Sequence, residues 1–202
     1  MAAPLPRAVF PAPAPVQGSR ARIPLTLPGG VFGKLLGWYS RRTYGKVMDP
    51  GLALVHHKRL MVAVVSFEQR IAKAKALDPR LKALAELATA VRVECEWCID
   101  FGFHEFVKLG LDAELLAEVP RWRGSERFSP LERDVLEYAD AMTATPPTVT
   151  DDLAGRLREE LGVRAFVELT KMISVENERA RFNAALGLAS QGFSESCRVP
   201  VR

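Results

Sequence analysis

The strongest constraint on the fold is a pair of consecutive helical patterns that meet at a Cys-X-X-Cys motif. Asp78-Pro79 supplies an N-cap residue and a first-turn proline, and the apolar residues after it recur at helical spacing as far as the motif. Cys95 and Cys98 follow at once, and a second helical pattern continues to about Leu109, with Gly110 as its stop. The sequence therefore predicts a helix that leads directly into the cysteine pair and a second helix that begins there.

The rest of the chain carries the same kind of signals. Capping residues, first-turn prolines and apolar positions at helical spacing recur between residues 49 and 189, and no stretch alternates apolar and polar residues as a half-buried strand would. The fold class is therefore predicted to be all-α, as a helical bundle. The expected helices span about residues 49–55, 57–76, 79–93, 95–109, 112–118, 130–145, 150–161 and 164–189.

The beginning of the chain differs from the remainder. Residues 1–30 hold half of the 14 prolines and show no helical or strand period, which predicts an extended or disordered Pro-rich arm. Residues 31–202 are expected to form a single domain. Its first part, Val31 to Tyr44, is dense in apolar and aromatic residues, and we expect it to dock as a strap across the domain or a neighbouring subunit.

Composition excludes several classes of protein. With 202 residues and 48% hydrophobic content, the chain can bury the core of a soluble globular domain. The net charge of +4 arises mainly before Asp49, and no basic, aromatic-bearing face follows, so we expect no nucleic-acid partner. No apolar run approaches the ~18 residues of a membrane span. Three cysteines do not make a secreted disulfide framework, so we expect a cytoplasmic protein without a membrane partner.

Three interpretations of the cysteine pair remain open. A redox dithiol would use a Cys98 thiolate, favoured by unpaired N–H groups at the helix start, to attack an oxidised substrate, and Cys95 would resolve the product as a disulfide. A structural zinc site would need about four ligands, for which His56, His57 or Cys197 would have to be recruited. The third interpretation is two buried cysteines that act as small hydrophobic side chains.

Acidic residues surround the pair and bear on this choice. Glu94, Glu96 and Asp100 lie within two residues of a cysteine, which indicates partial exposure of the motif. The same carboxylates disfavour a further negative charge on sulfur. If Cys98 is the nucleophile, the N–H donors at the helix start must therefore stabilise its thiolate by more than the three nearby carboxylates destabilise it.

Two segments of the chain resemble one known family. Residues 94–102 (ECEWCIDFG) and 175–187 (VENERARFNAALG) are similar to the carboxymuconolactone decarboxylase and alkylhydroperoxidase D (AhpD) superfamily, and the resemblance covers about residues 45–195. It implies an AhpD-like helical fold and a thiol-dependent, peroxiredoxin-type peroxidase without a cofactor or metal. It also implies Cys98 as the attacking thiol, Cys95 as the resolving thiol, a peroxide or other small-molecule substrate, recycling by an external dithiol, and a homo-oligomer.

The proton-handling positions of that family are changed in this sequence. The family's peroxidase pattern has a histidine four positions after the second cysteine, where this chain has Gly102, and a glutamate twelve positions before the first, where it has Ala83. The histidine often found between the cysteines is Trp97. Glu86 is the candidate substitute base, with His56 and His57 as further candidates. An alternative function is a non-catalytic or ligand-binding helical oligomer with a vestigial dithiol or metal site.

Overall fold

A computed structural model describes residues 21–194, in which all the elements are helices or 3₁₀ turns joined by loops, with no strand between those residues. The predicted all-α class is confirmed. The elements are α1 (Gly30–Tyr44), α2 (Asp49–Leu54), the 3₁₀ turn η1 (Val55–His57), α3 (Lys58–Ile71), α4 (Pro79–Val93), α5 (Glu96–Lys108), α6 (Ala113–Glu118), the 3₁₀ turn η2 (Val119–Gly124), α7 (Pro130–Thr143) and α8 (Asp151–Leu186).

The helices begin where local capping chemistry places them. The Asp78 carboxylate accepts the Arg80 N–H at 2.8 Å and so satisfies a free donor at the start of α4. Ser129 and Glu132 exchange side-chain and backbone hydrogen bonds in a capping box that opens α7. These starts agree with the sequence because a cap depends only on residues two or three positions apart.

The long helix α8 is bent at Gly162, whose φ of 75° and ψ of 158° lie outside the helical region. A φ in that region favours glycine because a Cβ atom would be strained there. The sequence predicts two helices divided at this glycine, and the bend confirms the division. The second half ends at Leu186, with Gly187 in the left-handed conformation.

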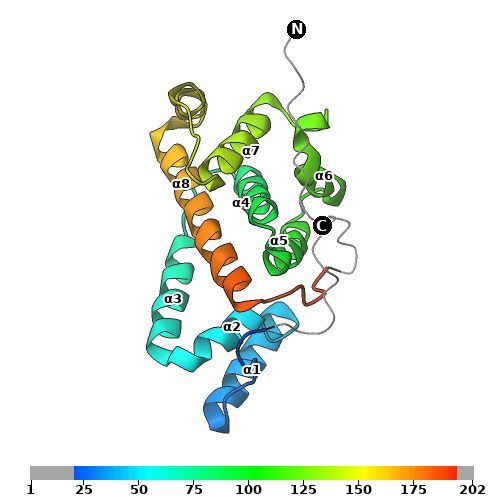
Figure 1. Cartoon of the computed structure of the whole chain (residues 1–202), viewed down its shortest axis with the longest axis vertical. Helices are drawn as coiled ribbons and strands as arrows, with labels where there is room; N and C mark the ends of the chain where they lie inside the picture. The colour runs from blue at the N-terminus through cyan, green and yellow to red at the C-terminus, as the bar shows by residue number, and fades with distance from the viewer. Residues whose placement is uncertain (1–20, 195–202) are drawn as a thin grey trace.

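Helix α4 lies at the centre of the bundle, and α5, α7 and α8 pack around it (Figure 1). Its apolar side chains form the middle of the core: Leu84 is 0% exposed and Leu87 is 1% exposed. Because α4 is buried on nearly all sides, the turn that follows it is held firmly between neighbouring helices. That turn carries the two cysteines.

Helices α1, α2 and α3 form the other end of the molecule, and α3 runs beside the second half of α8 (Figure 1). No residue of α3 is buried. Between α1 and residues 21–29 the backbone approaches closely at Gly33, where a Cβ would meet the Pro28 carbonyl oxygen at 1.7 Å. The segment Val31 to Tyr44 lies in helix α1, and most of its apolar side chains are exposed rather than docked across the domain. Its docking on a neighbouring subunit stays a prediction.

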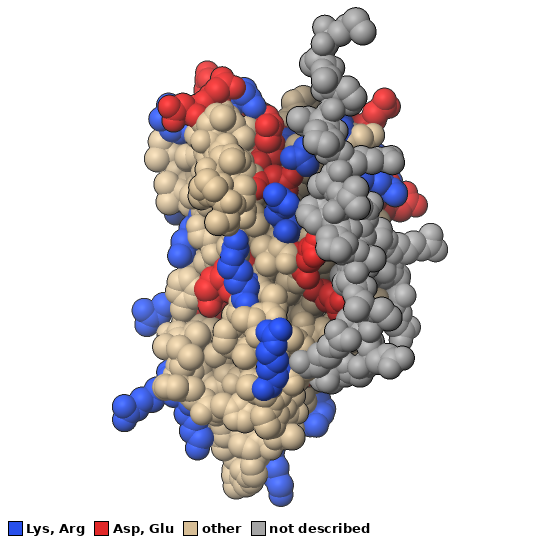
Figure 2. Space-filling model, in the orientation of Figure 1, with Lys and Arg blue, Asp and Glu red and all other residues tan. Residues whose placement is uncertain are grey.

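The surface differs between the two ends. In Figure 2, Asp and Glu gather on the upper part of the visible face, whereas the lower end, over α1 and α2, shows Lys and Arg around uncharged surface. Within the described part of the chain, no helix is both long enough and apolar enough to cross a membrane. Residues 1–20 of the predicted arm and Cys197 lie outside the described residues.

Candidate active site

The turn between α4 and α5 is short and tightly hydrogen bonded. Glu94 ends α4 with a φ of 60°, the left-handed conformation of a helix C-cap. The Cys95 N–H donates to the Ala90 carbonyl oxygen at 3.0 Å, which closes the end of α4. Since α5 begins at Glu96, Cys95 becomes the N-cap residue of α5. The sequence prediction that the motif opens this helix is confirmed.

The two cysteines are joined. Cys95 and Cys98 form a disulfide, with 5.3 Å between their Cα atoms. Residues three apart at a helix start lie on the same face of the first turn, so the bond closes without a change in the helix. The structure thus brings together the two sulfur-bearing residues selected from the sequence.

The helix-start donor is directed at Cys95 rather than at Cys98. The Cys98 backbone N–H donates to Cys95 Sγ, with an N–S distance of 3.2 Å, so Cys95 acts as the capping acceptor of α5. The expectation that free N–H groups at the helix start face Cys98 is therefore wrong. The physical reason is that an N-cap side chain accepts from the residue three positions later, not the reverse.

Both sulfurs lie in the core. Cys95 is 2% exposed and Cys98 is 7% exposed, so the expected partial exposure of the motif is also wrong. The acidic neighbours do not bring the cysteines to the surface. Glu94 is exposed while the adjacent Cys95 is buried, and the buried Asp100 carboxylate bonds to other residues. Cys98 is the more exposed residue of the two.

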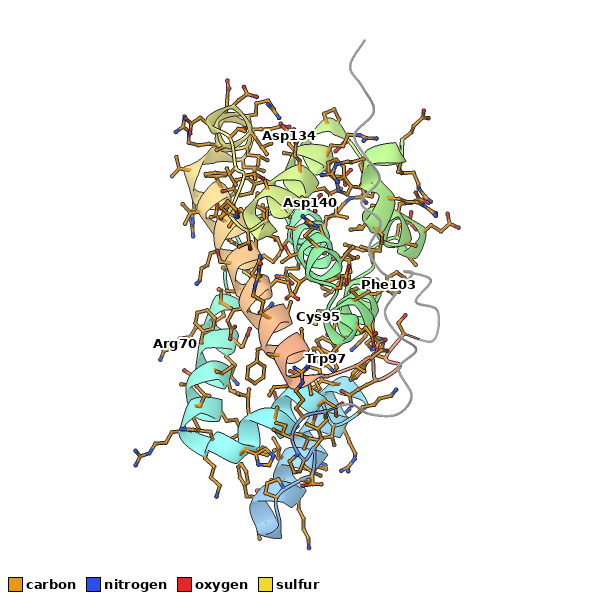
Figure 3. All side chains as sticks on the ribbon, viewed as in Figure 1. Arg70, Cys95, Trp97, Phe103, Asp134 and Asp140 are labelled. Atoms are coloured by element: carbon orange, nitrogen blue, oxygen red, sulfur yellow. A yellow bond between two sulfur atoms is a disulfide. The ribbon has the colours of Figure 1, made fainter. Side chains whose placement is uncertain are left out.

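Asn183, on the last turns of α8, completes the surroundings of the disulfide. Its Nδ2 lies 3.4 Å from Cys98 Sγ and 4.0 Å from Cys95 Sγ, and the residue is 3% exposed. Figure 3 shows Cys95 between α5 and the second half of α8. The cysteine pair therefore faces a polar position of α8 across an otherwise apolar contact.

One arginine on the same face of α8 gathers three carboxyl groups. Arg179 contacts Glu68 of α3 through two hydrogen bonds, of 2.9 Å from Nε and 2.5 Å from Nη2. Its Nη1 lies 3.2 Å from Glu176 Oε2 and 4.0 Å from Glu86 Oε2. We call these four residues the carboxyl cluster. It joins α3, α4 and α8 and precedes Asn183 along α8 by one to two turns.

The charges in the carboxyl cluster do not balance when all groups are ionised. Burial raises the pKa of Glu176 to about 8; the charge of Glu86 adds to the rise, and Arg179 opposes it. Burial likewise raises the pKa of Glu86, against the charges of Arg179 and Lys82. One guanidinium cannot neutralise three carboxylates, so Glu176 keeps a proton at neutral pH.

The other residues selected from the sequence have structural partners. Glu86 lies on α4 in the carboxyl cluster and makes no direct hydrogen bond to either cysteine within residues 21–194. His57 caps α3 by accepting the Leu60 N–H at 3.1 Å, and His56 Nε2 lies 2.8 Å from the Pro24 carbonyl oxygen. The two histidines are thus engaged outside the cysteine site.

The segment after α8 is tied to the cysteine helix by Asp100. Its carboxylate accepts four hydrogen bonds of 2.8–3.0 Å, donated by the Ser190 hydroxyl and by the backbone N–H groups of Gln191, Phe193 and Ser194. Trp97 adds a 2.8 Å bond from its indole N–H to the Gln191 side-chain oxygen. Figure 3 shows Trp97 beside this segment, which we call the strap (residues 188–194).

Trp97 and Gly102 occupy positions where the family pattern has histidines. Trp97 is 7% exposed and stacks on Phe101 with 4.8 Å between ring centroids, which makes it part of the packing under the strap. Gly102 lies within α5, and a Cβ there would meet only the Phe106 ring, at 3.4 Å. Ala83 is 1% exposed in the core of α4.

Sequence reasoning missed Asn183 and the partners of Arg179. The signal was present as a spacing: Glu176, Arg179 and Asn183 are three and four residues apart and so share one face of a helix. Nothing in the sequence, however, indicated that this face would meet the cysteines. Within residues 21–194, no three His, Cys, Asp or Glu side chains are arranged as ligands of a metal ion.

Comparison with known proteins identifies a family and a relative that this chain resembles in sequence. Residues 59–141 match the model of the carboxymuconolactone decarboxylase family, which spans α3 to α7. The uncharacterized protein YnjA of Escherichia coli K12 is 35% identical over 170 residues, which cover 82% of this chain and 90% of YnjA.

Solved structures share the fold. ATU0492 of Agrobacterium tumefaciens, described as an AhpD-type candidate for antioxidant defence, aligns with a TM-score of 0.62 and 23% identity, over 66% of this chain and 92% of its own. The debrominase Bmp8 aligns with a TM-score of 0.70 and 17% identity, over 79% and 86% of the two chains. With its cysteine pair at the head of α5 and an AhpD-like bundle around it, this chain belongs to the carboxymuconolactone decarboxylase family.

Proposed function

We propose that this protein is a thiol-dependent peroxidase in which Cys98 attacks the peroxide and Cys95 resolves the product. The observation that carries the proposal is the Cys95–Cys98 disulfide at the start of α5, next to a polar position of α8. The greater exposure of Cys98 supports its role as the attacking sulfur. Family membership and the AhpD-type relative support the reaction class.

The chemistry balances within the dithiol. The Cys98 thiolate attacks one peroxide oxygen, the O–O bond breaks, and the other oxygen leaves as an alcohol after it takes up a proton. The Cys98 sulfenic acid then reacts with the Cys95 thiol, releases water and leaves the disulfide. An external dithiol is oxidised as it reduces this bond. In sum, one peroxide and two thiols give one alcohol, one water and one disulfide.

Glu86 is the proposed proton-handling residue. Burial raises its pKa and so favours the protonated carboxyl, which suits it, within the carboxyl cluster, to handle a proton in place of the family's histidine and glutamate. Glu176, whose pKa is also raised by burial, shares Arg179 with it. Because Glu86 does not touch the sulfurs directly, we expect turnover to be slow.

Peroxide consumption coupled to a small dithiol is the direct test. Wild-type protein should consume peroxide, Cys98→Ser should not, and Cys95→Ser should react once and stop as a sulfenic acid that mass spectrometry of trapped thiols detects. Cys197→Ser is the matched control, since it removes a thiol outside the pair. Glu86→Gln should slow turnover without preventing disulfide formation.

The competing function is a ligand-binding helical oligomer with a vestigial dithiol. If Cys98→Ser consumes peroxide as fast as wild type, the peroxidase proposal is wrong and the binding role stands. Stoichiometric zinc in the purified protein would favour a metal site instead. The small-molecule substrate, the dithiol reductant and the homo-oligomer are part of the proposal, which includes no nucleic-acid or membrane partner.

A further inference from the structure

Asn183 is a buried polar side chain that the resemblance does not explain. It is 3% exposed, it lies on the second half of α8, and its side-chain nitrogen approaches both sulfurs. A disulfide sulfur carries no proton and can only accept, so the NH₂ group rather than the amide oxygen must face it. The amide therefore presents donors to the cysteine pair from the opposite wall of the core.

The two sulfurs have different donors. Cys95 Sγ takes the backbone N–H of Cys98 at 3.2 Å as part of the N-cap of α5. Cys98 Sγ has the Asn183 side chain at 3.4 Å. A thiolate in a buried, apolar site is costly unless it is hydrogen bonded, because burial disfavours the charged form. Since the helix start serves Cys95, a Cys98 thiolate depends on another donor.

The geometry points to Asn183 as the thiolate donor of Cys98: in the reduced protein its Nδ2–H hydrogen bonds the Cys98 sulfur and thereby favours ionisation of the attacking thiol. This inference rests on the proposed role of Cys98 as the attacking sulfur. Hydrogen bonds to a charged acceptor are stronger than those to a neutral one, so the contact stabilises the thiolate more than the thiol. Asn183 thus selects which of the two cysteines is the nucleophile.

The position of Asn183 is held from behind. Leu188 N–H donates to the Asn183 backbone carbonyl at 3.0 Å where the chain leaves α8, and the carboxyl cluster fixes the preceding turns to α3 and α4. The backbone that carries the amide is therefore fixed independently of the disulfide. When the disulfide opens, we expect the donor to stay next to Cys98.

The test measures the ionisation of Cys98 directly. In a Cys95→Ser, Cys197→Ser background, where serine still caps α5, the rate of iodoacetamide alkylation against pH reports the Cys98 thiol pKa. Asn183→Leu and Asn183→Asp should each raise this pKa by about one to two pH units, the loss of one charge-assisted hydrogen bond. Cys95, measured in a Cys98→Ser, Cys197→Ser background, should shift by less than half as much.

Asn177→Leu is the matched control. Asn177 lies on the same helix but bonds the Thr143 hydroxyl at 2.9 Å, so the Cys98 titration should be unchanged. An unshifted Cys98 pKa in folded Asn183→Leu or Asn183→Asp would overturn the inference. Should neither variant fold, NMR of the wild-type Asn183 side-chain amide decides: its proton shift must follow the Cys98 titration, and an amide insensitive to it overturns the assignment.

This experiment separates the two proposals. The alkylation readout contains no peroxide, so a protein that fails to turn over peroxide can still show the pKa shift. In that case Asn183 activates Cys98 for a different electrophile and the peroxidase proposal alone fails. If the protein consumes peroxide but the Cys98 pKa is unchanged in the Asn183 variants, the proposed function is supported and the role of Asn183 is wrong.

Discussion

Glu176 is the residue at which burial and charge conflict most directly. It is 6% exposed, it shares one guanidinium with two other carboxyl groups, and burial raises its pKa to about 8 from an ordinary value of 4.5. Such a group binds its proton more tightly in the folded chain than in the unfolded one. The carboxyl cluster therefore stores a proton at neutral pH at the expense of stability in alkaline solution.

Glu176→Gln should remove part of the pH dependence of stability. Between about pH 4.5 and pH 8 the unfolded chain loses the Glu176 proton while the folded chain keeps it, so the free energy of unfolding falls as pH rises through this window. Across this window the free energy of unfolding should fall by no more than about 3–5 kcal/mol. Urea unfolding at pH 5, 7 and 9 should show a flatter profile for Glu176→Gln than for wild type.

The exposed Glu178 on the same helix is the control for this experiment. Glu178→Gln should leave the pH profile of wild type unchanged. Equal slopes for wild type and Glu176→Gln would mean that Glu176 is already ionised in the folded protein at neutral pH.

Gly102→His tests whether the missing histidine limits turnover. The site can accept a Cβ atom, which meets only the Phe106 ring, at ordinary contact distance. A general acid–base group contributes about 10²–10⁴-fold in rate, and one restored member should recover about 10-fold in peroxide consumption. Gly102→Ala controls for the helix propensity gained by removing glycine. Equal rates for the two variants would mean that the missing histidine does not limit turnover.

At the scale of elements, the strap depends on one buried carboxylate. Asp100 is 4% exposed and accepts three backbone N–H groups and a hydroxyl from residues 190–194. Loss of that acceptor leaves backbone donors buried without partners, which is more costly than the loss of a surface contact. The strap in turn covers the aromatic side chains of α5.

Asp100→Ala should lower the free energy of unfolding by about 3 kcal/mol or more, while Asp100→Asn, which keeps one acceptor oxygen, should cost less. Urea unfolding gives the energies, and limited proteolysis should cut at residues 188–194 faster in Asp100→Ala. Glu105→Ala is the control on the same helix, because its ion pair with Lys108 is exposed and worth about 1 kcal/mol or less. Similar losses for the two variants would show that the strap contributes little.

How much of each element could be predicted depends on the range of the interactions that form it. The starts at Asp78 and Ser129 and the break at Gly162 follow from neighbouring residues, and the structure confirms them. Burial of the cysteines and the contact with Asn183 could not be predicted, because they join residues 85 or more positions apart. The direction of the helix-start donor depends on neighbouring residues alone, yet the prediction that it faces Cys98 is wrong, because the N-cap Cys95 accepts it.

At the scale of the whole molecule, the end formed by α1 and α3 presents apolar side chains to solvent. Val31, Leu35 and Trp38 are 73%, 60% and 64% exposed and follow one stripe of α1, and on α3 Val62 is 63% exposed. Exposed apolar surface of this kind marks interaction sites. It supports the expectation that copies of the chain associate through this end.

Light scattering should therefore give a mass of more than one chain at micromolar concentration. Leu35→Glu and Trp38→Glu should shift the mass toward a single chain, since a charge buried at an interface is costly. Lys34→Glu, an exposed position on the same helix, should not. A monomeric wild type would contradict the homo-oligomer, and an unchanged mass in both α1 variants would place the contact elsewhere.

The burial of the disulfide also determines how a reductant can reach it. Thiol–disulfide exchange requires direct approach to one sulfur, yet Cys95 and Cys98 are only 2% and 7% exposed. A bulky reductant must then wait for the core around the start of α5 to open locally. Above some concentration of reductant, the opening step alone sets the rate of reduction. The lifetime of the oxidised protein would thus be set by its own packing rather than by the concentration of thiols around it.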